Sequence, residues 1–290
     1  MFKGSIVAIV TPFRDGRVDE KALSELIEWH IAEGTDAIVP CGTTGESATL
    51  EYEEHYRVIE MTIKVVNKRV PVIAGTGANS TDETIMMTRK AKELGADGAL
   101  LVAPYYNKPT QEGLYRHYRA VAEAVDLPLV LYNVPGRTAV NIAPETVARL
   151  AEIENIVAIK EASANMRQVS DIIRLCGERI TLLSGDDFTT LPLMMLGGKG
   201  VISVVANVVP SKVAQLCKAC EEGRIEEARR LHYHLEPLNA AMFLETNPIP
   251  VKTALSMMGR IKEEFRLPLC EMADANKAKL QALLKDYGLI

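Results

Sequence analysis

The segment from Leu129 to Lys160, LVLYNVPGRTAVNIAPETVARLAEIENIVAIK, holds the unit that predicts the whole fold. Its two apolar ends, Leu129–Asn133 and Val157–Lys160, are rich in residues that strands favour. Between them, Glu145–Ala151 has the pattern of a helix. A strand, a crossover helix and a second strand over this length are typical of a unit with parallel strands.

The same alternation of short apolar runs and longer amphipathic segments recurs along the chain. The runs start roughly 20 to 33 residues apart, which is the spacing of strand–helix units rather than of hairpins. Eight runs are expected to be strands: Ile6–Val10, Ala37–Cys41, Val70–Gly75, Ala99–Ala103, Leu129–Asn133, Val157–Lys160, Thr181–Ser184 and Val201–Val205. Helices are expected between them, including Asp19–Ile31, Thr81–Leu94, Gln111–Val125 and Glu145–Ala151.

Strands that read as continuous apolar runs are buried on both faces, as parallel strands are. Eight such units predict an α/β fold, a closed (β/α)8 TIM barrel over residues 1–223. A small C-terminal helical extension is expected over residues 224–290, with helices at Ile225–Leu235, Pro250–Met258 and Asp274–Tyr287. An open, doubly wound sheet is the alternative, but no G-x-G-x-x-G follows the first strand.

Charge and composition point to a small ligand. The 290 residues carry a formal net charge of −5 and contain no run rich in lysine or arginine, so no nucleic-acid partner is expected. No stretch reaches the roughly 18 consecutive apolar residues of a membrane span. The apolar run Ile6–Val10 is also too short for the core of a secretion signal. We therefore expect a cytoplasmic protein without membrane contact.

The five cysteines do not suggest a metal site. An odd number of scattered cysteines without a secretion signal predicts reduced thiols. Cys217 and Cys220 form a C-x2-C pair, but no second pair accompanies them, so both are interpreted as ordinary helix residues. We expect no bound metal.

In such barrels the active site lies at the carboxyl ends of the strands, so polar residues there are the candidates. Lys160 ends a run in which alternation places it on the same face as Ile156 and Ala158. If that face is the barrel interior, the amine is desolvated, its neutral form becomes accessible, and it can attack a carbonyl to form an imine. The alternative is a structural lysine paired with Glu161 or Asp186.

Tyr132 favours the catalytic interpretation. It shares a face with Val130 at the end of the neighbouring strand. Adjacent strands lie about 4.8 Å apart, so the phenol and the Lys160 amine can meet. A tyrosine in this place can exchange protons with the carbinolamine hydroxyl during imine formation.

Two further strand-end segments could bind carboxylates. The turn Gly42-Thr-Thr-Gly-Glu46 offers two hydroxyls and backbone N–H groups, which can cradle a carboxylate or a phosphate. Arg137 follows a Pro-Gly turn and can hold a second carboxylate with two hydrogen bonds, although a loop arginine can also be merely solvated. Gly197-Gly-Lys-Gly200 lacks the phosphate-loop pattern and is interpreted as a turn into the eighth strand.

At these residues the chain resembles the dihydrodipicolinate synthase/N-acetylneuraminate lyase family. The most specific segments are Gly42-Thr-Thr-Gly-Glu-Ser-Ala-Thr-Leu50, Tyr132-Asn-Val-Pro-Gly-Arg-Thr138 and Ile159-Lys-Glu-Ala162. The resemblance covers essentially the whole chain, from the first strand through Asn247-Pro-Ile-Pro-Val-Lys252 to the C-terminal helices.

The resemblance implies a catalytic set of four residues. Lys160 resembles the lysine that forms the imine with pyruvate, and Tyr132 the tyrosine that transfers protons. The tyrosine is linked through Thr44 to Tyr106, which in the family reaches across a dimer interface from the neighbouring subunit.

The resemblance also implies which residues bind substrate. Thr43 and Thr44 match the residues that bind the pyruvate carboxylate, and Arg137 matches the group that holds the carboxylate of L-aspartate 4-semialdehyde. Gly185 and Ile202 match residues whose carbonyl groups line the pocket. Sialic-acid lyases of the family generally lack an arginine at this distance after the tyrosine, so Arg137 together with Tyr106 favours the condensing enzymes.

The implied reaction is that of a class I (Schiff-base) lyase in lysine and diaminopimelate biosynthesis. A pyruvate enamine attacks the semialdehyde, and cyclisation releases 4-hydroxy-tetrahydrodipicolinate and water, without a metal or an organic cofactor. One alternative is a pyruvate-dependent aldolase acting on a sugar acid or keto acid. Another is a barrel that binds a keto acid without turnover, although such a binder has no use for a proton relay.

Bacterial members of the family are often inhibited by L-lysine at the dimer interface. The positions that resemble this site are Ser47, Ala48, His55, Asn79, Glu83 and Tyr105. Tyr52 departs from the histidine of well-inhibited relatives, which puts inhibition in doubt. The resemblance further implies a homotetramer, built as a dimer of dimers.

Overall fold

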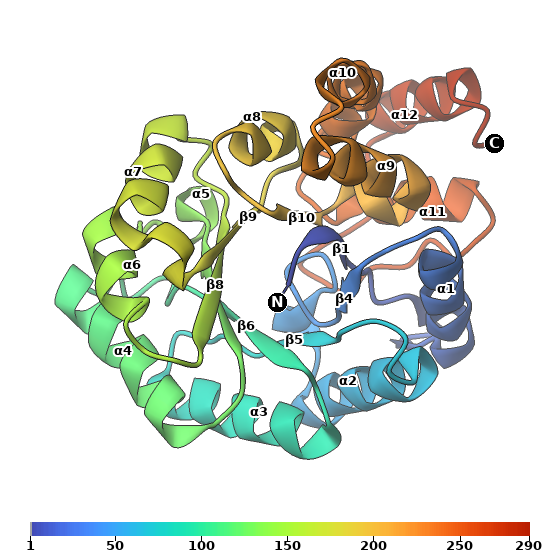
Figure 1. The fold of residues 1–290 in the computed structure, drawn as a ribbon. Coiled ribbons are helices and arrows are strands. Elements are labelled where there is room, and N and C mark those ends of the chain that lie inside the picture. Colours follow the sequence, from blue (N-terminus) through green and yellow to red (C-terminus); the bar gives the residue numbers. More distant parts are fainter. Residues whose placement is uncertain (1) are drawn as a thin grey trace.

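A computed structural model describes residues 2–290 and confirms the predicted barrel (Figure 1). Within these residues, eight parallel strands form one sheet in the order β4-β1-β10-β9-β8-β7-β6-β5. The two ends of this order meet, because Ile38 N donates to Pro71 O over 3.0 Å and Ile38 forms a parallel bridge with Val72. The strands are β1 (Gly4–Ala8), β4 (Ala37–Val39), β5 (Ile73–Gly75), β6 (Gly98–Val102), β7 (Leu129–Asn133), β8 (Ile156–Glu161), β9 (Thr181–Ser184) and β10 (Gly200–Ser203).

A ring of helices surrounds the strands in Figure 1. The main helices of this ring are α1 (Glu20–Ala32), α2 (Tyr52–Val66), α3 (Thr81–Leu94), α4 (Gln111–Ala124), α6 (Pro144–Leu150), α7 (Met166–Cys176), α8 (Thr190–Met195) and α9 (Pro210–Glu221). Helix α3 has the predicted bounds because it is capped at both ends: Ser80 accepts a hydrogen bond from Glu83 N, and Gly95 ends the helix at φ +96°. The sequence pattern does not delimit α2, α7, α8 and α9, nor the hairpin of β2 (Phe13–Arg14) and β3 (Arg17–Val18).

Side chains of alternating residues fill the barrel interior. One interior cluster contains side chains from most of the strands, among them Ile6, Ala8, Val39, Ile73, Leu100, Val130, Tyr132, Ala158, Leu183 and Ile202. The remaining strand residues face the helices, as Leu131 and Ile159 do. The strands are therefore buried on both faces, which explains why they read as continuous apolar runs.

One prediction about strand faces is wrong. Ile156 packs in the outer cluster with Leu129, not on the interior face with Ala158. The pairing of β7 with β8 shifts, so that Leu129 pairs with Ile156 whereas Val130 pairs with Ala158. Val157 is the extra residue, and a bulge of this kind interrupts the alternation locally. The carboxyl end of β8, which carries the active-site candidate, keeps its predicted faces.

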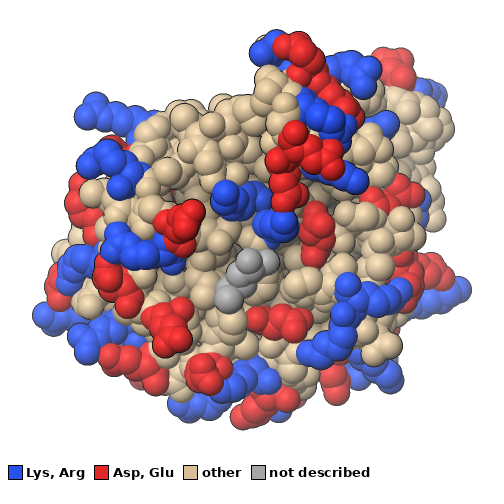
Figure 2. Space-filling view, viewed as in Figure 1, with Lys and Arg blue, Asp and Glu red and all other residues tan. Residues whose placement is uncertain are grey.

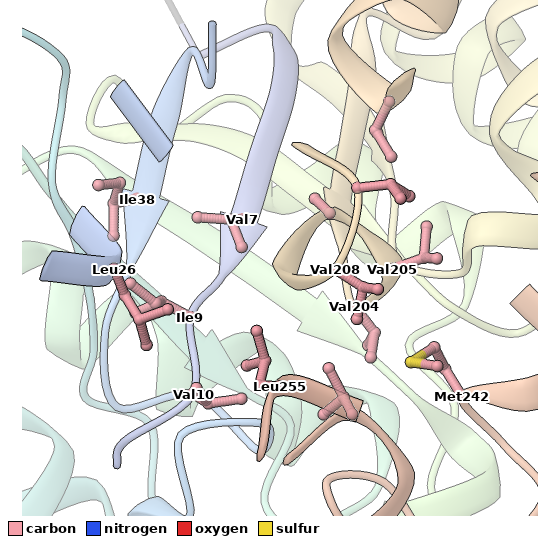
Figure 3. Close-up of a cluster of buried hydrophobic side chains, with 14 of the residues drawn as sticks. Val7, Ile9, Val10, Leu26, Ile38, Val204, Val205, Val208, Met242 and Leu255 are labelled. Atoms are coloured by element: carbon pink, nitrogen blue, oxygen red, sulfur yellow. The ribbon is translucent and has the colours of Figure 1, made fainter. Parts of the chain in front are cut away.

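The residues after 223 form the helices α10 (Ile225–Ala241), α11 (Ile249–Met257) and α12 (Asp274–Asp286). Helix α10 continues past the predicted end at Leu235, through Pro237. Met242 and Leu255 belong to the same buried cluster as Val10 and Val204, which follow strands of the barrel (Figure 3). The extension thus packs on the carboxyl ends of the strands. The division into residues 1–223 and 224–290 stays a prediction.

The surface carries charges of both signs. Figure 2 shows lysine and arginine side chains interspersed with aspartate and glutamate side chains over the face seen in Figure 1. Of the helices formed by residues 2–290, none is long and apolar enough to cross a membrane.

Candidate active site

Lys160 and Tyr132 lie side by side at the carboxyl ends of β8 and β7. They are partners in the parallel register of these strands, and Lys160 Nζ lies 4.2 Å from the centre of the Tyr132 ring. Both side chains are buried, at 5% and 6% exposure. The structure therefore brings a buried amine next to a phenol, as the alternation of residues along the two strands predicts.

Glu161 is not the partner of Lys160. Its carboxylate faces the helices and accepts hydrogen bonds from Asn133 Nδ2 and Gln168 Nε2, both over 2.9 Å, and from Ser163 N over 2.7 Å. Three donors satisfy this buried carboxylate without a cation. The alternative of a structural pair between Lys160 and Glu161 is therefore excluded.

A cavity of about 340 Å³ opens at Lys160. Its lining combines glycines and apolar side chains with a small number of polar ones, as is usual for a small-molecule site. The polar side chains of the lining are Thr43, Thr44, Tyr132, Arg137, Lys160, Asp186 and Asn247. Five of these seven are residues that the sequence analysis places in the site.

Gly185 lines the same cavity and packs tightly against the lysine. A Cβ atom added at Gly185 would lie 2.8 Å from Ala162 Cβ and 2.9 Å from Lys160 Cγ. Only glycine fits here without displacing Lys160. Ile202 packs deeper, fully buried in the interior cluster of the barrel.

The turn that carries Thr43 and Thr44 is closed by its own backbone. Gly45 N and Ser47 N both donate to Gly42 O, over 3.1 and 3.3 Å. Thr44 is 3% exposed, and its Oγ1 accepts a hydrogen bond from Asn247 Nδ2 over 3.0 Å. Because the hydroxyl oxygen accepts from Asn247, the hydroxyl hydrogen is left to donate to another group.

Arg137 lies at the rim of the cavity. It belongs to the short helix α5 (Pro135–Thr138), which directly follows β7, and its side chain is exposed. One of its donors is used within the chain, since Nη2 donates to Asn247 O over 3.2 Å. A guanidinium has five N–H donors, so a planar pair remains for a carboxylate.

Tyr106 lies apart from the other predicted catalytic residues. It is 91% exposed, its backbone has φ +70°, and the lining of the Lys160 cavity, taken over residues 2–290, does not include it. A bulky residue with a left-handed backbone is uncommon and marks a functional or strained position.

Asn247 and Asp186 are the polar lining residues that the sequence analysis does not assign to the site. Asp186 follows β9, and burial raises the pKa of its carboxyl group. Asn247 comes from the C-terminal extension and contacts both Thr44 and Arg137. The strand-end rule cannot find Asn247, whose sequence signal is its place at the start of the segment Asn247–Lys252, which resembles the family.

A second cleft, of about 640 Å³, lies beside the first. The two cavities share four lining residues: Thr43, Val134, Arg137 and Asn247. Most residues predicted to bind lysine line this second cleft: Ser47, Ala48, His55, Glu83 and Tyr105. Asn79 does not line it in the described chain; its carbonyl oxygen accepts from Asn107 Nδ2 over 2.9 Å.

Two side chains of this cleft, Tyr52 and His55, already form hydrogen bonds within the chain. Tyr52 OH donates to Glu83 Oε1 over 3.1 Å, and this hydrogen bond raises the pKa of Tyr52. His55 Nε2 lies 2.7 Å from Gly75 O, and burial lowers the pKa of His55, which keeps the ring neutral. Glu83 is thus already engaged before any ligand binds.

The potential metal ligands are dispersed. Across residues 2–290, no group of three or more His, Cys, Asp or Glu side chains is arranged to hold a metal ion. Cys217 and Cys220 both lie in helix α9, as expected, and neither forms a disulfide.

Residues 1–287 match the protein family described as the dihydrodipicolinate synthetase family. The chain belongs to this family. A 4-hydroxy-tetrahydrodipicolinate synthase of Thermodesulfovibrio yellowstonii is 71% identical over 290 residues, which cover 100% of both chains.

Two solved synthases of the family have the same fold. The chloride-inhibited dihydrodipicolinate synthase of Acinetobacter baumannii, complexed with pyruvate, is 52% identical over 100% of both chains, with a TM-score of 0.98. The dihydrodipicolinate synthase of Cyanidioschyzon merolae with lysine bound is 42% identical over 100% of this chain and 99% of that one, with a TM-score of 0.97. These similarities confirm the predicted TIM barrel and the predicted lyase, a 4-hydroxy-tetrahydrodipicolinate synthase of lysine and diaminopimelate biosynthesis.

Proposed function

We propose that the cavity at Lys160 condenses pyruvate with L-aspartate 4-semialdehyde through an imine on this lysine. The observation that carries the proposal is the contact of Lys160 Nζ with the Tyr132 ring at 4.2 Å inside a buried cavity. The amine supplies the nucleophile, and the phenol lies within reach of the oxygen that must leave as water.

The first half of the reaction forms the imine. The neutral amine of Lys160 attacks C2 of pyruvate, and the carbinolamine that results loses its hydroxyl as water when Tyr132 donates a proton to it. Removal of a proton from C3 then gives the enamine. Thr43 and Thr44 hold the pyruvate carboxylate through hydroxyl and backbone N–H groups of their turn, which keeps C2 next to Nζ.

The second half joins the two substrates. The enamine C3 attacks the aldehyde carbon of the semialdehyde and forms the new carbon–carbon bond. The amino group of the semialdehyde then adds to the imine carbon and expels Lys160 as a free amine. The products are the heterocycle 4-hydroxy-tetrahydrodipicolinate and one water, so the enzyme returns to its starting state.

Arg137 selects the second substrate. Its exposed guanidinium stands at the rim of the cavity, where the end of a bound semialdehyde distant from C3 would lie. A pair of the N–H donors that its bond to Asn247 leaves free matches the spacing of a carboxylate. Gly185 lines the cavity, whereas Ile202 lies outside its lining and packs in the interior cluster of the barrel.

We propose that Tyr106 completes the site of a neighbouring subunit. Its exposed ring and left-handed backbone suit a residue that projects into another chain. There it would extend the proton relay of Tyr132 and Thr44. The proposed assembly is a homotetramer, a dimer of dimers.

The second cleft is the proposed site of L-lysine as an inhibitor. Glu83 would pair with an amino group of the ligand, beside Ser47, Ala48, His55 and Tyr105; Asn79 would complete the set only after its loop moves. The hydrogen bond from Tyr52 to Glu83 must yield to the ligand, so we expect weak inhibition. The location proposed for the enzyme is the cytoplasm, whose reducing conditions suit five free cysteines.

A substrate comparison tests this function. The purified enzyme is given pyruvate with L-aspartate 4-semialdehyde, pyruvate with a sugar aldehyde, or N-acetylneuraminate alone, and pyruvate is followed by mass spectrometry. We expect pyruvate to be consumed only with the semialdehyde. Turnover of a sugar substrate at a higher kcat/KM than the semialdehyde would contradict the proposal and favour an aldolase.

A further inference from the structure

The most deeply buried ion pair of the described chain does not belong to the catalytic set. Lys252 of α11 pairs with Glu46, and neither side chain has any exposed surface. Lys252 Nζ also lies 4.3 Å from the centre of the Phe13 ring. The second carboxylate oxygen of Glu46 accepts from Arg266 N over 3.2 Å, so both partners of this carboxylate come from the C-terminal extension.

A gain in stability is a weak reason for burying this ion pair. Removing two charges from water costs much of what their attraction returns, and well-packed apolar residues of similar volume are often as stable. The place of the pair in the fold suggests another reason. Glu46 is the residue that ends the Gly42-Thr-Thr-Gly-Glu46 turn, where it has a left-handed backbone at φ +54°.

Glu46 is hydrogen-bonded to the turn that faces the pyruvate side of the cavity. Its backbone N–H donates to Thr43 O over 3.1 Å, so the two ends of the short loop that contains Thr44 are held together. Thr44 itself is held by Asn247, which lies just before α11. The extension therefore holds the turn at two points: at Thr44 through Asn247, just before α11, and at Glu46 through Lys252 of α11.

We propose that Lys252 is a positioning residue for catalysis: through Glu46 it fixes the Thr43–Thr44 turn at the depth where pyruvate meets Lys160. This inference rests on the proposed function, because it needs that turn to hold pyruvate. Lys252 touches no substrate. The extension would thus act on the first half of the reaction, although it contributes no residue that forms a bond to substrate.

The test removes both charges together, so that no lone charge is left buried. In the double variant Glu46→Gln/Lys252→Met, the glutamine can still accept from Arg266 N, and the methionine fills the space of the lysine stem. Borohydride trapping of the pyruvate adduct and the KM for each substrate are measured on the folded fraction from size exclusion. We expect the trapping rate to fall and the pyruvate KM to rise, each by about tenfold or more, with the semialdehyde KM changed less than about twofold.

A matched control is Lys262→Met. Lys262 lies in the same extension and binds Asp15 over 2.8 Å, but this pair is largely exposed and lies outside the turn. Its trapping rate should stay within about twofold of wild type, because exposed pairs contribute little. Should the double variant not fold, Glu46→Asp, which keeps both charges but shortens the carboxylate arm, is measured in the same assays, with the same expected split between the two substrates.

The results separate this inference from the proposed function. A folded variant whose pyruvate trapping rate and KM stay within about twofold of wild type overturns the positioning role, as does an equal loss for both substrates. Absence of any pyruvate adduct in the wild-type enzyme would instead overturn the function on which the inference rests.

Discussion

Tyr132 and Lys160 are register partners on neighbouring parallel strands, and the lysine amine lies 4.2 Å from the centre of the tyrosine ring. The parallel register places both Cα atoms at the same height in the barrel, so a flexible loop is not needed to bring the two groups together. The pair is therefore built before substrate arrives, which is the arrangement that lowers the cost of reaching the reactive geometry.

Gly185→Ala should slow imine formation. The new Cβ would lie 2.8 Å from Ala162 Cβ and 2.9 Å from Lys160 Cγ, so the lysine must shift. A displacement of about 1 Å at a reacting group can cost about 100-fold in rate, and we expect a loss of 10- to 100-fold in borohydride trapping. Gly136→Ala is the control, because no heavy atom lies within 4 Å of its added Cβ. Equal trapping rates in the two variants would refute the steric argument.

Arg137→Ala should impair use of the semialdehyde and spare the pyruvate adduct. Hydrogen bonds to a charged group contribute about 1.5–3 kcal/mol, so kcat/KM for the semialdehyde should fall by about 10- to 100-fold. Steady-state kinetics with each substrate varied in turn measure the split. An unchanged semialdehyde KM and kcat would remove the role given to Arg137.

Tyr52→Phe should strengthen lysine binding. The variant loses the hydroxyl that occupies the Glu83 carboxylate, and this exposed hydrogen bond is worth about 0.5–1.5 kcal/mol, or about 2- to 10-fold in Kd. Isothermal titration calorimetry of both proteins with L-lysine measures the change, with the exposed Tyr233→Phe as control. Weaker binding in Tyr52→Phe would show that the hydroxyl helps the ligand instead of competing with it.

His30→Gln should make the protein less sensitive to acid. His30 is fully buried, and burial lowers its pKa from 6.5 to about 3. As the pH falls below 6.5, His30 therefore binds a proton in the unfolded chain but not in the folded chain. The contribution of His30 to the free energy of unfolding is complete above pH 6.5 and is lost as the pH falls toward 3. Between about pH 7 and pH 5, the variant should lose about 2 kcal/mol less free energy of unfolding than wild type. Urea unfolding measures this loss, and the exposed His234→Gln should match wild type.

The fold could be predicted because its strands are short, buried and separated by helices. Helix α3 even has the predicted bounds, since its caps lie within its own sequence. The alternation predicts the wrong face for Ile156, because the bulge at Val157 depends on the register of β8 with β7. Local alternation carries no information on such a register shift.

The site could be predicted only where strand ends supply it. Lys160, Tyr132 and the Thr43–Thr44 turn follow from the barrel rule and the chain order. Asn247 could not be predicted in this way, because it is 203 positions from Thr44, its hydrogen-bond partner. It belongs to the helical extension, and local sequence patterns do not show where that extension packs. Lys252 lies in the same extension, and local pattern likewise gives no sign of its buried pair with Glu46.

If Lys160 forms the imine with pyruvate, borohydride must fix the pyruvate on this lysine and on no other. The enzyme is incubated with pyruvate and borohydride, digested, and mapped by mass spectrometry, with Lys160→Ala and the exposed Lys199→Ala treated in parallel. We predict one reduced pyruvate per chain, on Lys160, in wild type and in Lys199→Ala, and none in Lys160→Ala. An adduct that persists in Lys160→Ala, or no adduct in wild type, would contradict the account.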